Sequence, residues 1–335
     1  METGEHKQKN GRVIRKTSVA GYKNLLKNIN DFQEYAQKIY FIRDYDCLKT
    51  QREKKAENKY WNKFYFEFTE FLYVKKNGFD NYVGTQIKLL RAFFNYLASE
   101  QILTLGHYIE FFYVVSEDIP VVALAPEQLN FLIFNKEFEN ALSKRLRIIK
   151  DMFVFGCFTA LRFSDLTCVK RKNLEQINKN TYLVISSIKT GIPSRVLLPS
   201  FICDIINRDK RRKVSIFPPI SKVNFNIALK QICLKAGWTH EVMKKRNKRG
   251  IPSEILPIND SQKSYRFCDL VSSHLMRRTA ITTMLRLGMH ETNVRLISGH
   301  KPNSKSFYRY VYVADSFMDE VLDAMHEKLK KMSYE

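Results

Sequence analysis

The stretch Ser273-His274-Leu275-Met276-Arg277-Arg278-Thr279-Ala280 places a histidine and an arginine three positions apart. The residues from His274 to Leu287 have a helical pattern, and a glycine follows them at position 288. Side chains three apart share one face of a helix, so we expect His274 and Arg277 to point the same way. This pair is weakly specific by itself, and its meaning depends on the rest of the chain.

An arginine stands among apolar residues upstream, in Thr159-Ala160-Leu161-Arg162-Phe163-Ser164-Asp165-Leu166. A buried guanidinium needs a counter-charge, which here is either Asp165 or an external anion such as phosphate. On this segment alone, a salt bridge between Arg162 and Asp165 is the favoured interpretation.

A histidine follows a glycine in Ser298-Gly299-His300, 23 residues beyond Arg277. A single histidine in this setting usually caps a helix or packs, so the triplet alone does not indicate catalysis. An aromatic cluster, Phe307-Tyr308-Arg309-Tyr310-Val311-Tyr312, comes next, and core packing is its simplest explanation.

Residues 181–199 predict a β-hairpin, because two β-forming runs flank the turn-like Lys189-Thr190-Gly191. Lys189 then lies at the tip of the hairpin. The alternative is an exposed turn lysine without a chemical role.

The chain is strongly basic, since 56 Lys and Arg against 34 Asp and Glu give a formal net charge of +22. Nucleic acid is the first candidate partner, because each neutralised phosphate releases counterions. An anionic membrane surface is the rival. No apolar run approaches the roughly 18 residues of a spanning helix. No signal-peptide core is found either, so we expect a cytoplasmic protein.

The 6 cysteines contain no C-x2-C pair, which argues against a structural zinc site and a disulfide scaffold. All but Cys47 lie in apolar or mixed contexts, so we expect buried, reduced thiols. The sequence implies no metal and no cofactor.

A length of 335 residues predicts two domains, since single cores stop growing at about 250 to 300 residues. Pro120 and Pro126 bracket an extended segment that marks the boundary. We expect a basic arm at residues 1–30, a helical domain at 31–120 and a second domain at 121–335.

Phosphate-facing residues are expected in both domains. The helix predicted from Val83 to Ala98 has Lys88 and Arg91 on its polar face, where they either hold a phosphate backbone or only face solvent. The stronger candidate is the basic segment 207–250. It contains the run Lys244, Lys245, Arg246, Lys248 and Arg249.

The conjunction of these weak signals resembles the tyrosine recombinase (phage integrase) family, and within it a bacterial mobile-element integrase. The family's order and approximate spacing are matched by Arg162, Lys189, the His274-x-x-Arg277 pair, Gly299-His300 and a downstream tyrosine. The resemblance covers nearly all of the second domain and extends more loosely to the first, through Tyr82 to Leu97.

The resemblance implies a mainly α fold with a small β-hairpin or sheet (α+β). A helical core-binding (SAM-like) domain and a catalytic domain would close around the duplex as a C-shaped clamp. In these roles Arg162 and Arg277 would hold the scissile phosphate, and His300 would donate a further hydrogen bond to it. His274 would position the nucleophile or handle its proton, and Lys189 would protonate the leaving 5′-oxygen.

The nucleophile is the point at which this chain departs from the family spacing. The family usually places its tyrosine nine residues after the histidine of Gly-His, which here is Arg309. Tyr308 and Tyr310 flank that position, and the run resembles family members that use the second tyrosine, so Tyr310 is preferred. Arg278, where the family often has histidine, is a second and tolerable departure.

The resemblance further implies site-specific cutting and rejoining of double-stranded DNA through a 3′-phosphotyrosyl intermediate and a Holliday junction, without metal or ATP. The partners would be specific DNA sites at the nucleoid, three further copies of the chain, and accessory DNA-bending or directionality proteins. An amphipathic helix predicted at 317–332 would link subunits or pack on its own domain. The alternatives are a type IB topoisomerase-like enzyme and a non-catalytic DNA-binding or architectural regulator.

Overall fold

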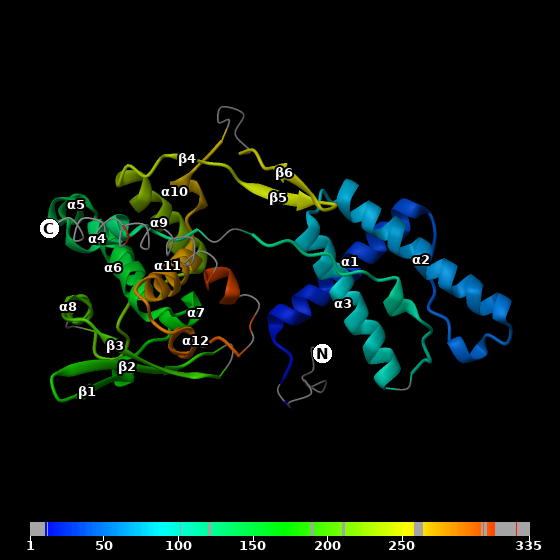
Figure 1. Cartoon of the computed structure of the whole chain (residues 1–335), viewed down its shortest axis with the longest axis horizontal. Coiled ribbons are helices and arrows are strands. Elements are labelled where there is room, and N and C mark those ends of the chain that lie inside the picture. Colours follow the sequence, from blue (N-terminus) through cyan, green and yellow to red (C-terminus); the bar gives the residue numbers. More distant parts are fainter. Residues whose placement is uncertain are drawn as a thin grey trace. The chain divides into compact units, whose positions relative to one another are not determined.

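The computed structural model describes residues 11, 13–100, 102–119, 122–188, 191–209, 212–257, 264–302, 304, 307–311 and 326. Contacts divide the chain into two compact units. Unit 1 contains Met1–Ile119 and Lys244–Ile255, and unit 2 contains Pro120–Met243 and Leu256–Glu335. The chain therefore passes between the units at three places, and each unit is described by itself (Figure 1).

Unit 1 is built on three long helices, α1 (Lys16–Ala36), α2 (Gln51–Val74) and α3 (Asp80–Ser99), with short 3-10 turns at Tyr45–Cys47 and Tyr108–Glu110. Helix α2 begins at a capping box, in which Thr50 and Glu53 satisfy each other's backbone N–H groups. The core between the helices is rich in aromatic rings that meet edge to face and tilted. It includes Phe32, Trp61, Phe64, Phe68, Phe94 and Phe112.

The first helix differs from the expected basic arm at 1–30. Helix α1 begins at Lys16, and its Leu25 and Asn28 are buried in unit 1. The amide of Asn28 donates to Gln86 and Tyr82 on or beside α3. A periodic apolar face is present in this segment, but its many lysines concealed it in the sequence.

Strands β5 (Lys245–Lys248) and β6 (Ile251–Glu254) form a hairpin that belongs to unit 1, beside the blue and cyan helices in Figure 1. The two turn residues, Arg249 and Gly250, both have positive φ, at 58° and 76°. This is the pattern of a two-residue hairpin turn whose twist matches the strands.

Acidic residues of unit 1 hold this hairpin. The carboxylate of Asp80 accepts the backbone N–H groups of Arg249 and Gly250 at 2.7 and 2.9 Å. Glu117, which is 7% exposed, accepts from Arg246 Nε at 2.6 Å and from the backbone N–H of Asn247. These contacts place the hairpin in unit 1, whereas the sequence interpretation kept all of 121–335 in one second domain.

Unit 2 packs its helices around one large apolar core. In chain order the helices are α4 (Pro126–Phe134), α5 (Lys136–Ala141), α6 (Lys144–Thr159), α7 (Phe163–Leu166), α8 (Ser200–Asn207), α9 (Lys222–Lys235), α10 (Phe267–Leu270), α11 (Ser273–Arg286) and α12 (Glu291–Ser298). Helix α6 lies in the centre, and α11 packs along it (Figure 1). A Cβ at Gly156 would collide with Met276, so this glycine allows α11 to approach α6 closely.

A three-stranded antiparallel sheet, ordered β1-β2-β3, covers one side of unit 2. Its strands are β1 (Leu174–Ile177), β2 (Asn180–Ser186) and β3 (Pro193–Leu198). The expected hairpin is therefore present as β2 and β3, with Ser186 opposite Pro193. A second small sheet pairs β4 (Glu241–Val242) with β7 (Tyr265–Arg266). The α+β fold class predicted from the sequence is confirmed.

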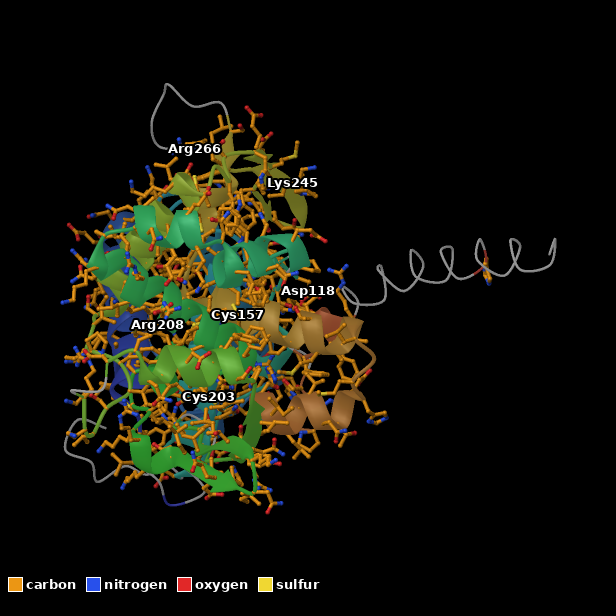
Figure 2. All side chains as sticks on the ribbon, turned by 90° about the vertical axis from the view of Figure 1, so that its left-hand side faces the viewer. Asp118, Cys157, Cys203, Arg208, Lys245 and Arg266 are labelled. Atoms are coloured by element: carbon orange, nitrogen blue, oxygen red, sulfur yellow. The ribbon has the colours of Figure 1, made fainter. Side chains whose placement is uncertain are left out.

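The cysteines follow the expectation of burial only in part. Cys157 is buried within the helical part of unit 2, and Cys203 is half-buried (Figure 2). Cys168 is exposed, as Cys47 is. Cys168 follows the short helix α7, where the chain turns toward the surface, and this is why its apolar sequence context was misleading.

The ion pair between Arg246 and Glu117 should contribute to the stability of unit 1. Replacing Arg246 with Met leaves the buried carboxylate without its cation, which we expect to cost about 3 kcal/mol. The chain has 2 tryptophans, so a Trp238→Phe background leaves Trp61 as a reporter of unit 1 in urea unfolding. Lys245→Met, at an exposed position on the same strand, is the control. Equal unfolding midpoints for the two variants would contradict the assignment.

Candidate active site

The site begins where α6 ends. Ala160 adopts a left-handed conformation with φ of 52°, which ends the helix and turns the chain into Arg162. The carbonyl of Ala160 accepts a hydrogen bond from Arg277 Nη1 at 2.7 Å. Arg277 is only 2% exposed, so this turn and α11 hold its guanidinium from two sides.

Arg162 directly precedes the first residue of α7, and its side chain reaches the loop after β2. Its Nη1 donates to Ser187 Oγ at 3.0 Å. Ser187 Oγ in turn lies 3.3 Å from Asp165 Oδ2, and Asp165 Oδ1 accepts the backbone N–H of Ile188 at 3.0 Å. Asp165 is 1% exposed. The carboxylate of Asp165 therefore holds the loop after β2 in place. The sequence favoured a direct salt bridge between Arg162 and Asp165, whereas in the structure Ser187 bonds to both residues.

His300 follows α12, whose end is formed by Gly299 in a left-handed conformation with φ of 61°. Ser298 Oγ lies 2.8 Å from His300 Nδ1 and donates to the carbonyl of Val294 at 2.6 Å. Arg277 Nη2 lies 3.2 and 3.3 Å from the two ring nitrogens of His300. Arg277 and His300, which are far apart in the sequence, thus meet through direct contact.

The two candidate tyrosines differ in environment. Tyr310 is 5% exposed and packs with Ala160, Ala280 and Phe307. Its ring centroid lies 6.0 Å from that of His300. Tyr308 is 40% exposed, and its ring lies against the guanidinium of Arg295 on α12. Of the two, Tyr310 is the residue beside the arginine and histidine cluster.

Burial and positive charge lower the pKa of the site's bases. Desolvation first, and then the charges of Arg277 and Arg162, lower the pKa of His300 to about 3. His274 remains partly open to solvent, and desolvation together with Arg278 and Arg277 lowers its pKa to about 4. Desolvation and Arg162 lower the pKa of Arg277 to about 10, which still leaves it protonated at neutral pH.

A small pocket lies among these residues. It is lined by both arginines, by the Ser187 and Ser298 that bond to the site, and by Asp165. Two guanidinium groups line this pocket, and His300 contacts one of them, Arg277. Planar guanidinium groups suit the paired oxygens of a phosphate, so this pair of arginines can offer hydrogen bonds to such a group.

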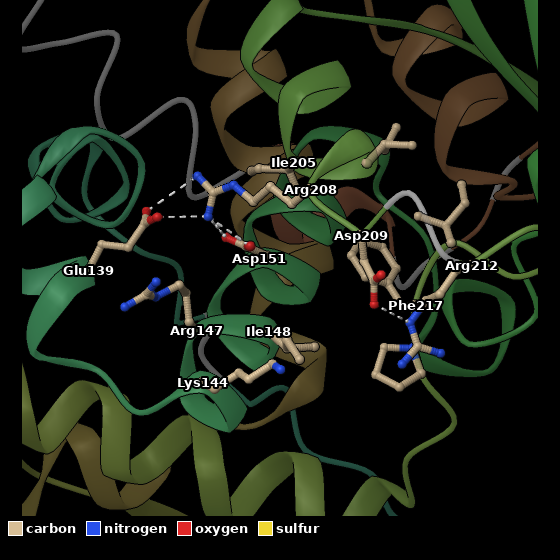
Figure 3. Close-up of a pocket in the computed structure, with 13 residues that line it drawn as sticks. Glu139, Lys144, Arg147, Ile148, Asp151, Ile205, Arg208, Asp209, Arg212 and Phe217 are labelled. Carbon is tan, nitrogen blue, oxygen red and sulfur yellow. Dashed lines mark hydrogen bonds and ion pairs between the residues drawn. The ribbon is translucent and has the colours of Figure 1, made fainter.

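A larger pocket, of about 320 Å³, lies at the other end of α6 (Figure 3). Arg208 there makes ion pairs with Glu139 and Asp151 at 2.8 and 2.9 Å. The ammonium of Lys150, 1% exposed, also pairs with both carboxylates. These charges compensate one another, so the network holds the start of α6 to its neighbours. It contains none of the arginines and histidines of the site described above.

The structure brings together Arg162, Arg277, His300 and Tyr310, with His274 near the arginines. Lys189 lies outside the described residues. Sequence reasoning missed Ser187 and Ser298, because a serine has no distinctive spacing signal. It identified Asp165 but not its role as the acceptor that holds the loop after β2.

Some of the expected phosphate-facing residues of unit 1 are exposed, and others are engaged in contacts within the unit. Lys88 and Lys245 are exposed. Arg91 is half-buried and donates to a backbone carbonyl at 3.4 Å. Arg246 and Arg249 are occupied by ion pairs with Glu117 and Glu70, and Lys248 donates to Asn77 at 3.0 Å. Lys244 has a half-buried side chain. The basic run is therefore in part a structural element of unit 1, which its sequence could not show.

Within the described part of the chain, no group of three or more His, Cys, Asp and Glu is arranged to hold a metal ion. Among the helices in these same ranges, none combines the length and apolar character needed to cross a bilayer.

No protein-family sequence model matches the chain, and no curated protein matches it. Solved structures do match. The Tn1549 transposon integrase in complex with transposon right end DNA is similar with a TM-score of 0.57 and 15% identity, over 92% of this chain and 95% of that one. XerH site-specific recombinase bound to palindromic difH substrate matches with a TM-score of 0.56 and 13% identity, over 90% and 77%. A lambda integrase dimer bound to a COC' core site matches with a TM-score of 0.53 and 13% identity, over 90% and 90%. The chain thus has the fold of tyrosine recombinases.

The lowered histidine pKa values predict a pH dependence of stability. Both values lie below the unfolded value of about 6.5, so the unfolded chain binds more protons and stability falls as pH drops from about 6.5 toward 4. Urea unfolding of the wild type and of a His274→Gln, His300→Gln variant measures this. Above pH 7 the free energies of unfolding of the wild type and the variant should differ by a constant amount. Below pH 6.5 the wild type should lose more of its free energy of unfolding than the variant does. A difference that stays constant down to pH 4 would show that the histidines are not shielded in this way.

Proposed function

We propose that this chain is a site-specific DNA recombinase that cuts and rejoins strands through a 3′-phosphotyrosyl bond. The observation that carries the proposal is the convergence of Arg162, Arg277, His300 and Tyr310 within unit 2. The similar recombinase structures are complexes with a difH substrate, a COC' core site and transposon end DNA, and they support double-stranded DNA as the partner. The net charge of +22 is consistent with such a partner.

In the proposed reaction, Arg162 and Arg277 hold the two non-bridging oxygens of the scissile phosphate. Their charges stabilise the added negative charge of the transition state, and burial of Arg277 strengthens that interaction. Because Arg277 is bound to Ala160 and contacts His300, its orientation is set before DNA arrives. The side chain of Arg277 therefore needs little reorganisation at the moment of reaction.

Tyr310 is the proposed nucleophile. Its hydroxyl loses a proton and its oxygen forms a bond to phosphorus while the bond to the 5′-oxygen breaks. The 5′-oxygen takes a proton, for which Lys189 remains the proposed donor. His274 is the proposed group that positions the tyrosine or handles its proton, and its lowered pKa leaves it neutral, so the ring can accept a hydrogen bond from the tyrosine hydroxyl. The phosphotyrosyl bond retains the bond energy, so a second strand end can reverse the reaction without ATP.

Covalent trapping tests the chemistry. The protein is incubated in EDTA with nicked duplexes tiled across the DNA that flanks its gene, and nucleotide-linked peptides are identified by mass spectrometry. We expect an adduct on Tyr310, lost in Tyr310→Phe and retained in Tyr308→Phe.

Each other result has a distinct meaning. An adduct on Tyr308 would keep the reaction and overturn the choice of nucleophile. Tight binding with no adduct in any duplex would favour a non-catalytic DNA-binding protein on this fold.

Subunit assembly is proposed as well. The amphipathic segment 317–332, which lies outside the described residues apart from His326, carries the apolar positions Phe317, Val321, Leu322, Met325 and Leu329. We propose that it docks on a neighbouring copy and joins four subunits on two duplexes.

Truncation tests this assembly. Deleting residues 317–335 should abolish the paired-duplex complex in native gel shifts but leave binding to a single duplex within about twofold. A truncated protein that still pairs duplexes would contradict the assembly role.

A further inference from the structure

Ser298 is the polar residue closest to His300, and its single hydroxyl proton has three acceptors within reach. The carbonyl of Arg295, at 3.4 Å, is the most distant, and the two nearer acceptors compete for the proton. One is the carbonyl of Val294, 2.6 Å from Ser298 Oγ on the preceding turn of α12. The other is His300 Nδ1, at 2.8 Å. Ser298 is 2% exposed, so water does not compete for either bond. If the hydroxyl donates to His300 Nδ1, a neutral His300 carries its hydrogen at Nε2. If the hydroxyl donates to Val294, its oxygen can accept from Nδ1, and the ring hydrogen is then at Nδ1.

Arg277 does not settle that choice. Its Nη2 lies almost equally far from both ring nitrogens, at 3.2 and 3.3 Å. The two nitrogens flank one ring carbon, so a donor this close to both lies over the ring and not in line with either lone pair. Among the described residues, no other partner is found for Nε2, which is left to a group that enters the site.

Burial, and after it the surrounding charges, keep the ring neutral. His300 is faced by Arg277 and His274 from α11, by Arg162 from the start of α7 and by Arg295 from α12, with Tyr310 packed beside it. A neutral imidazole carries one N–H. If that N–H is at Nδ1, Nε2 can only accept, and it would repel a phosphate oxygen.

We propose that Ser298 is a positioning residue that switches His300 from acceptor to donor when a phosphate group enters the site. This inference rests on the proposed function. Without phosphate, Ser298 donates to Val294 and accepts from His300 Nδ1–H. With phosphate at Nε2, the hydroxyl turns to donate to Nδ1 and the ring carries its hydrogen at Nε2, where it donates to a phosphate oxygen. One proton leaves Nδ1 and one arrives at Nε2 through solvent, so the net protonation of the protein does not change.

The tautomer is measured directly by long-range 1H–15N correlation NMR on protein labelled at histidine, with inorganic phosphate as the probe. We expect the Nδ1–H form in the free protein and the Nε2–H form with phosphate bound. An Nε2–H ring in the free protein, a doubly protonated ring with phosphate, or a ring that phosphate does not affect would each overturn the proposal.

Substitutions separate this role from packing. Ser298→Ala should remove the phosphate-dependent change of tautomer and slow covalent adduct formation by about tenfold, the effect of one lost hydrogen bond. Ser298→Thr keeps a hydroxyl and should retain both. Thr69→Val is the matched control, because the buried Thr69 Oγ1 donates to the Tyr65 carbonyl at 2.7 Å within α2 of unit 1, so the variant removes a similar hydrogen bond away from His300.

The outcomes also distinguish this inference from the proposed function. A tautomer change in a protein that never forms a tyrosyl adduct would support the role of Ser298 and contradict the recombinase reaction. A phosphate-dependent change of tautomer that persists in Ser298→Ala, with normal adduct formation, would overturn the role of Ser298 and leave the reaction in place.

Discussion

Burial of the Arg277 guanidinium is the constraint on which unit 2 depends. A charge that is 2% exposed is costly unless it is hydrogen-bonded, and here the carbonyl freed by the left-handed turn at Ala160 provides the bond. The same turn brings Arg162 back toward the loop after β2. The end of α6 therefore places Arg162 and provides the hydrogen-bond acceptor for Arg277, while Gly156 leaves room for the Met276 side chain of α11.

The remaining polar residues of the site are also held by hydrogen bonds to buried or half-buried partners. Asp165 accepts from the loop after β2, Ser187 bonds Arg162, and Ser298 bonds His300. Each of these polar groups is buried or half-buried, and each has a partner that limits its rotation. A site built in this way holds its cations close together before an anion enters. The same arrangement keeps His274 and His300 neutral, because burial and the nearby arginines lower the pKa of each.

Much of the fold could be predicted from local patterns. The α6, α11 and α12 helices, the hairpin of β2 and β3 and the boundary near Pro120 follow from periodicity, turn residues and proline. The hairpin of β5 and β6 could not be assigned to unit 1, because its contacts with Asp80 and Glu117 join residues far apart in the sequence. Its basic residues suggested a DNA surface, yet the buried carboxylate of Glu117 neutralises Arg246. Arg162, Arg277, His300 and Tyr310 could be named as candidates from the family motif, whereas serines that act through a neighbour were visible only in the structure.

The central claim is that Arg162, Arg277, His300 and Tyr310 converge on one phosphate. A crystal structure of the protein with orthovanadate, which takes the geometry of a phosphoryl transition state, tests it most directly. We expect one vanadate bonded to Tyr310 Oη, with both guanidinium groups and His300 Nε2 within hydrogen-bond distance of its oxygens. Vanadate bonded to Tyr308, or held at the pocket of Glu139 and Arg208 and absent from this site, would contradict it.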